Sequence, residues 1–158
     1  MRVALLAFLA LAGCSTYNET NYFSVDSTFV LVADSFVGMH EKTDREELKI
    51  FLEVDPLRTE WCAAFVNAVL GVSGEQGTDS LLARSFLDWG VSVDSPEKGD
   101  VVIFPRGRSS WQGHVGFFVE EFERDGIRYY VILGGNQENK VSYDVFRADK
   151  ALGIRRAI

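Results

Sequence analysis

The sequence predicts an α+β domain in which several helices are followed by an antiparallel β-sheet. Residues 26–90 carry apolar side chains at helical spacing between capping residues. Residues 100–156 instead carry short apolar or alternating runs that are typical of strands. Two of these runs flank Asp125-Gly126, a dipeptide that favours a tight hairpin, so the strands that it joins are expected to be antiparallel.

Four helices are expected in the first half of the chain. Their apolar residues recur at intervals of three and four, and polar or glycine residues stand at their ends. The expected segments are 26–37 before Gly38, Arg45–Glu53, 60–70 after Pro56, and a last helix capped by Asp79 or Ser80 and closed by Gly90.

The third of these helices carries a cysteine in its first turn. With Thr59 as N-cap and Gly71 as C′ residue, its apolar stripe consists of Cys62, Phe65, Val66, Val69 and Leu70. The N–H groups and dipole at a helix start stabilise an anion, so the Cys62 thiol is expected to ionise below its usual pKa of about 8.5. The alternative is that Cys62 is a small apolar residue of the core.

The strands follow a turn at residues 96–99. Their β-branched and aromatic residues, and the turn residues between them, indicate a sheet against which the third helix packs. The expected strands are Asp100–Phe104, His114–Glu120, Arg128–Leu133, Val141–Phe146 and Gly153–Arg156.

Length and charge restrict the class of function. The 158 residues fit one domain, and a hydrophobic content of 47% is enough for a sizeable core. A formal net charge of −7 argues against binding to the phosphate backbone of nucleic acids. The sequence contains no internal repeat, no phosphate-binding glycine loop and no metal-type cluster of Cys and His, and we expect no metal or organic cofactor.

The N-terminus has the features of a secretory signal. A short basic start precedes the apolar run Val3–Leu11, which is too short to cross a bilayer of about 30 Å. With Ala12-Gly13-Cys14 it resembles a bacterial lipoprotein signal and its lipobox, and the alternative is an uncleaved apolar tail. The resemblance implies a signal peptide at 1–13, an acylated Cys14 and tether at 14–25, a folded domain at 26–158, and anchoring in the bacterial envelope, at the outer rather than the inner membrane. Cys62 would then lack a disulfide partner.

A histidine and two amides accompany the cysteine. Two glycines leave space around His114 at the start of its strand, and the neighbouring strand ends in two glycines followed by Asn136 and Gln137. Either amide could orient an imidazole, and we favour Asn136 over Gln137. Trp61 and Trp111 are expected in the core or in the wall of a substrate groove.

These residue types fit nucleophilic catalysis. A thiolate attacks an acyl carbon, an imidazole transfers the proton to the leaving amine, and a third group orients the ring. The backbone N–H of Cys62 can stabilise the oxyanion. Each residue alone has an ordinary explanation, since a histidine at a strand start is often a surface residue and Gly-Gly-Asn is often a turn. Their combination favours catalysis.

Four stretches resemble the CHAP group, the cysteine, histidine-dependent amidohydrolases/peptidases of the papain-like, NlpC-type superfamily of cell-wall hydrolases. In order, they are Trp61-Cys62-Ala63-Ala64-Phe65-Val66-Asn67, Gly99-Asp100-Val101-Val102-Ile103-Phe104, Gly113-His114-Val115-Gly116-Phe117 and Leu133-Gly134-Gly135-Asn136-Gln137. The resemblance covers residues 26–156 and departs from the group in lacking a separate wall-binding module and in having a lipobox.

This resemblance implies a papain-like fold with Cys62 as nucleophile, His114 as base and Asn136, or less favourably Gln137, as the third residue. It also implies peptidoglycan as substrate, cut within the stem peptide or between the glycan and its first alanine. We therefore expect a monomeric, membrane-anchored hydrolase that forms a thioacyl intermediate. The alternatives are a non-catalytic wall-binding lipoprotein of the same fold and a papain-like enzyme that transfers the acyl group to an amine.

Overall fold

The computed structural model describes residues 25–158, so the expected signal peptide and Cys14 lie outside the described residues. The helical segments are α1 (Val25–Asp34), α2 (Arg45–Leu52), α3 (Cys62–Val72), and the 3₁₀ turns η1 (Ala83–Asp88) and η2 (Ala148–Lys150). The strands are β1 (Val91–Ser92), β2 (Val101–Pro105), β3 (Gly113–Arg124), β4 (Ile127–Gln137), β5 (Lys140–Arg147) and β6 (Gly153–Arg156). No helix in this described part is long and apolar enough to span a membrane.

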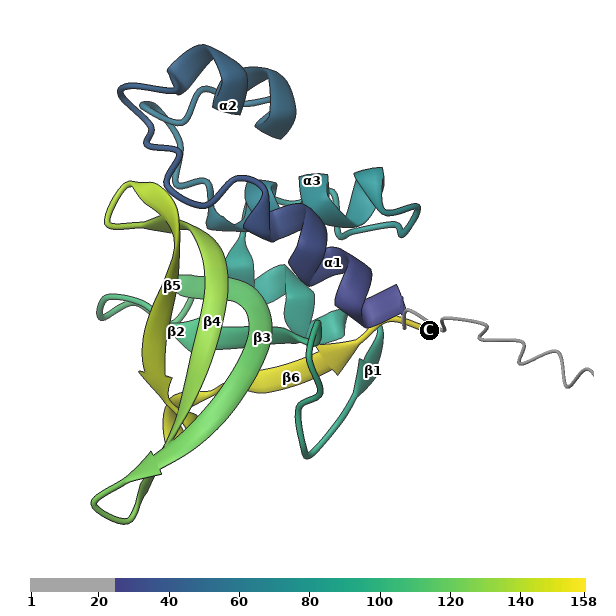
Figure 1. Ribbon diagram of the computed structural model, residues 1–158, viewed down its shortest axis with the longest axis vertical. Helices are drawn as coiled ribbons and strands as arrows, with labels where there is room; N and C mark the ends of the chain where they lie inside the picture. The colour runs from purple at the N-terminus through teal and green to yellow at the C-terminus, as the bar shows by residue number, and fades with distance from the viewer. Residues whose placement is uncertain (1–24) are drawn as a thin grey trace, which may run out of the picture.

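The strands form one six-stranded sheet in the order β1-β6-β2-β3-β4-β5, and every strand pair is antiparallel (Figure 1). The predicted α+β class is therefore confirmed. The Asp125-Gly126 hairpin is also confirmed: both residues have positive φ, 54° and 71°, as a two-residue turn between twisted strands requires.

Several helix limits differ from the prediction. Thr59 is not the N-cap of α3, because the helix begins at Cys62 with Trp61 in the cap position and no side-chain cap. The same helix continues past Gly71 to Val72. The expected fourth helix is the short 3₁₀ turn η1, and Asp79 adopts a φ of 53° before it. The helix α1 ends at Asp34, after which Ser35 to Val37 form hydrogen-bonded turns.

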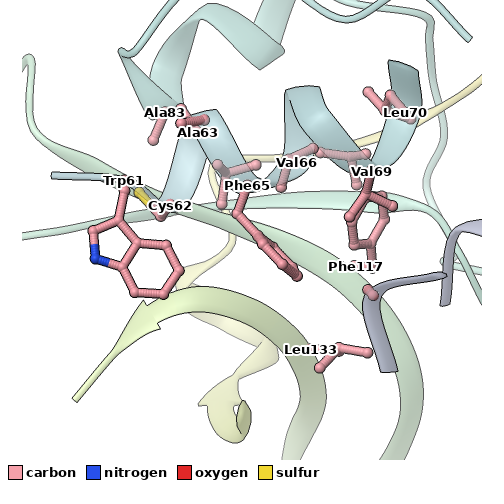
Figure 2. Packing of buried hydrophobic residues seen from close by; sticks show 14 of the residues in the cluster. Trp61, Cys62, Ala63, Phe65, Val66, Val69, Leu70, Ala83, Phe117 and Leu133 are labelled. Atoms are coloured by element: carbon pink, nitrogen blue, oxygen red, sulfur yellow. The ribbon is translucent and has the colours of Figure 1, made fainter. Parts of the chain in front are cut away.

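The helix α3 packs across the middle of the sheet. Its buried residues share one core with α1, α2 and the facing side of β3 and β4. Figure 2 shows Phe65, Val66 and Val69 directed toward Phe117 of β3 and Leu133 of β4. Burial of this apolar stripe fixes the position of the first turn of α3, and thus of Cys62, against the sheet.

A glycine allows the closest approach between α3 and β4. A Cβ atom on Gly135 would lie 2.5 Å from the Trp61 ring and 2.7 Å from Cβ of Phe65. We expect Gly135→Ala to lower the free energy of unfolding by about 1–3 kcal/mol, because overpacking must displace the start of α3. Urea unfolding measures this change. Gly71→Ala in the same helix is the control, because its Cβ would meet no atom within 4 Å. Equal stability of both variants would contradict this account of the packing.

Candidate active site

The cysteine lies where α3 meets β3. Cys62 is the first residue of α3 and is 3% exposed. The backbone N–H of Val115, the residue after His114, donates to its sulfur. The helix start therefore brings the thiol to the segment of β3 that carries the histidine, as the sequence predicted.

The histidine is buried next to aromatic residues of β2 and β5. His114 is 4% exposed and pairs with Phe104 across β2 and β3. Its ring stacks on Phe146 with 5.4 Å between the centroids and 18° between the planes. Its Nε2 lies 2.9 Å from Oε1 of Gln137.

This hydrogen bond defines the tautomer of the ring. The amide nitrogen of Gln137 donates to the backbone carbonyl oxygens of Ser142 and Ile132, so its Oε1 faces the imidazole as an acceptor. His114 must then carry its proton on Nε2. In the neutral ring Nδ1 is left as the acceptor, which is the form that a general base needs.

The contact with His114 belongs to Gln137, so our preference for Asn136 is corrected. Asn136 has a φ of 56° and donates through Nδ2 to Oε2 of Glu60 at 2.7 Å. The pairing of β4 with β5 shifts register between Gly134 and Gln137, which breaks the simple alternation of side chains. Gly134 leaves the space into which Gln137 reaches, since a Cβ there would lie 3.1 Å from its Oε1.

An arginine that the sequence analysis did not single out lies beside the pair. Arg106 follows β2, and its Nη2 donates to the carbonyl oxygen of Asn136 at 3.2 Å. Its Nη1 is 3.3 Å from Oε2 of Glu60. The available signal was its place in the sequence, directly after a buried strand that is a neighbour of the His114 strand.

Burial dominates the protonation of both reactive groups. It raises the pKa of the Cys62 thiol, and the nearby Arg106 and the Val115 N–H only partly oppose this. It lowers the pKa of His114 to about 4, which the hydrogen bond that the ring donates to Oε1 of Gln137 only partly opposes. The expectation of an easily ionised thiol is therefore wrong, because desolvation outweighs the helix start. At neutral pH the resting pair is a thiol and a neutral imidazole.

One cavity is lined by Cys62 and another by His114, and Arg106 lines both. The thiol-side cavity, of about 180 Å³, is lined by Glu60, Cys62, Leu81, Leu82, Ala83, Arg106, Gly107, Trp111, Gln112 and Gly113. The imidazole-side cavity, of about 160 Å³, is lined by Pro105, Arg106, His114, Asn136, Gln137, Glu138, Asp144 and Phe146. Together they provide space for a substrate on both sides of the reactive groups.

The two tryptophans differ in position. Trp111 is 62% exposed and lines the thiol-side cavity, as a groove residue would. Trp61 is fully buried, and its Nε1 donates to Oε2 of Glu41 at 3.2 Å. A groove position for Trp61 is therefore wrong, and the core position that we also considered is correct.

Within residues 25–158, no group of three His, Cys, Asp or Glu side chains could hold a metal ion.

Comparison with known families gives one match. The model of the CHAP domain matches residues 54–136, a segment that contains Cys62, His114 and Asn136 and ends one residue before Gln137. No curated protein matches the sequence. CHAP domains are commonly peptidoglycan hydrolase domains. Since the match covers more than half of the sequence, the chain belongs to the CHAP domain family.

Proposed function

We propose that this protein hydrolyses an amide bond of peptidoglycan through a thioacyl intermediate on Cys62. The observation that carries the proposal is the placement of two buried groups: a thiol at a helix start that the Val115 N–H contacts, and, one residue earlier on β3, an imidazole whose Nε2 donates to Oε1 of Gln137. Membership of the CHAP family supports peptidoglycan as the substrate. The packing of the thiol-bearing helix on an antiparallel sheet also agrees with a papain-like arrangement.

In the first half of the reaction, Nδ1 of His114 takes the thiol proton while the sulfur attacks the carbonyl carbon. The backbone N–H of Cys62 stabilises the negative charge that develops on the carbonyl oxygen. The carbon–nitrogen bond then breaks, and His114 returns the proton to the leaving amine. The acyl group stays on the sulfur as a thioester.

In the second half, a water molecule attacks the thioester carbon. His114 takes one proton from this water, the carbon–sulfur bond breaks, and the proton passes back to the sulfur. One amide and one water thus give one carboxylic acid and one amine. Each group of the site returns to its starting state.

We also propose that residues 1–13 are a signal peptide and that lipid on Cys14 tethers the domain at 26–158 to the outer membrane. The sequence pattern of residues 1–14 supports this proposal. Tethering would raise the effective concentration of the enzyme near the wall.

Digestion of defined muropeptides, with the products weighed by mass spectrometry, tests the activity. We expect two fragments whose masses sum to those of the substrate and one water. A product that has gained an amine in place of water would indicate acyl transfer. Binding of an uncut muropeptide would indicate a non-catalytic wall-binding protein, and either result would contradict hydrolysis.

The protonation of His114 predicts an unusual pH profile. The ring acts as a base only when neutral, and its pKa is about 4, so kcat/KM should fall on the acidic side near pH 4 rather than near 6.5. Initial rates across pH measure this limb. An acidic limb near 6.5 would contradict the buried neutral ring.

The lowered pKa of His114 also makes the stability of the folded protein depend on pH. Stability must therefore be measured at each pH as a control for the activity profile. Between pH 6.5 and about 4 the unfolded chain binds a proton at His114 that the folded chain does not, so stability falls as the pH is lowered through this window. Thermal unfolding at each pH separates loss of fold from loss of activity.

A further inference from the structure

Arg106 is placed to act on a substrate as well as on its protein neighbours. Its guanidinium lies at the junction of the two cavities and acts electrostatically on both Cys62 and His114. Its Nη1 is buried and has no hydrogen-bond partner among the described residues, although Oε2 of Glu60 lies 3.3 Å away as an ion pair. The Arg106 side chain as a whole is 41% exposed, so this buried donor atom belongs to a charged group that faces open space, which favours an anionic ligand.

We propose that Arg106 binds a free carboxylate of the substrate on the acyl side of the scissile amide. The preferred acyl residue would then carry an unamidated carboxyl group near the carbonyl that Cys62 attacks. This inference rests on the proposed hydrolase function and specifies the chemistry of its substrate.

The charged residues that line the two cavities indicate that the carboxylate binds on the acyl side of the scissile amide. The acyl carbon must reach the sulfur of Cys62, so the acyl residue occupies the thiol-side cavity, whereas the amine leaves toward His114. The imidazole-side cavity is lined by Glu138 and Asp144, which would repel a carboxylate. In the lining of the thiol-side cavity, Glu60 is the acidic residue.

The carboxylate of Glu60 marks where an anion fits. It accepts a hydrogen bond from Nδ2 of Asn136 and lies beside Nη1 of Arg106, yet its side chain is 78% exposed. Such an exposed ion pair is weak, so a substrate carboxylate can displace Glu60 at little cost. The exposed apolar side chains of Leu81, Leu82 and Trp111 line the same cavity and would shield the new pair from water.

Two stem peptides that differ at one group test the inference. One carries a glutamyl residue with its free α-carboxylate on the acyl side, and the other carries the α-carboxamide at the same position. We expect the wild-type protein to favour the free acid by about tenfold in kcat/KM, and Arg106→Gln to lose this preference. Arg106→Lys should retain a smaller preference, because an ammonium keeps the charge without the planar fork.

Arg108→Gln is the matched control, because it removes the same charge from an exposed residue of the same loop that lines neither cavity. It should keep the wild-type preference. A general loss of activity in Arg106→Gln, caused by release of the Asn136 carbonyl, affects both peptides equally and cancels in the ratio. If Arg106→Gln does not fold, the comparison of the two peptides with the wild-type protein still tests the inference.

Two results would overturn the inference while leaving the hydrolase intact. The first is equal cleavage of both peptides by the wild-type protein, and the second is an unchanged preference in a folded Arg106→Gln protein. If the wild-type protein cuts neither these peptides nor any other muropeptide, the proposed function fails together with the inference.

Discussion

Replacement of Cys62 by alanine should abolish the release of soluble muropeptides from purified cell walls and leave thermal unfolding nearly unchanged. The substitution removes the only atom that bonds to the acyl group in the proposed reaction, so we expect a loss of at least about 10,000-fold in rate. Cys62 is a small residue that is 3% exposed, and its loss to alanine should cost no more than about 1 kcal/mol of stability. Turbidity of cell-wall suspensions and calorimetry measure the two effects.

Cys62→Ser is the companion variant. It keeps the size of the side chain and supplies a hydroxyl, but His114 is a poor base for a group that is much less acidic than a thiol. This variant should therefore be folded and inactive. Clearance of cell walls by the alanine variant at the wild-type rate would remove Cys62 from the mechanism.

The second large effect is expected at Gln137, whose Oε1 lies 2.9 Å from Nε2 of His114. Gln137→Ala removes the acceptor that holds the Nε2 proton, so the ring can adopt the other tautomer and lose its base at Nδ1. We expect kcat to fall by about 100-fold with little change in KM, because a positioning residue acts on the chemical step. Steady-state kinetics on a defined muropeptide measure both constants.

A shift in the acidic limb of the pH profile of kcat/KM would separate a positioning role of Gln137 from a purely structural one. The hydrogen bond that His114 donates to Oε1 of Gln137 raises the pKa of His114, so Gln137→Ala should move the limb to lower pH. Gln137→Glu should move it to higher pH, because a carboxylate stabilises the imidazolium. Asn136→Ala is the control, since its amide contacts Glu60 and not the ring, and it should lose less than about tenfold. A larger loss in Asn136→Ala than in Gln137→Ala would reverse the assignment.

The elements that the sequence predicted best are those fixed by local physics. The Asp125-Gly126 turn needs two residues that tolerate positive φ, and the strand β6 was predicted with the limits that the structure shows. The start of α3 was not predicted, because it depends on the fit of Trp61 against Gly135 across the core rather than on a capping side chain. Such a contact between distant parts of the chain has no local signal.

The residues of the candidate site likewise divide into those placed by local sequence and those placed by contacts between distant parts of the chain. The sequence placed Cys62 in the first turn of a helix and His114 near the start of a strand, and the structure shows both positions, whereas their catalytic roles stay a prediction. The choice between Asn136 and Gln137 depends on a register shift in β4, and the role of Arg106 depends on two cavities that form only in the folded chain. The direction of the Cys62 pKa shift likewise follows from burial, which outweighs the favourable helix start.

Digestion of a muropeptide in oxygen-18-labelled water, with wild-type and Cys62→Ala proteins side by side, tests whether the amide is hydrolysed through a thioester on Cys62. Amide hydrolysis through a Cys62 thioester should give a new carboxyl group that carries one solvent oxygen with the wild-type protein and no product with the variant. Label-free products, or labelled products in equal yield from both proteins, would contradict the account.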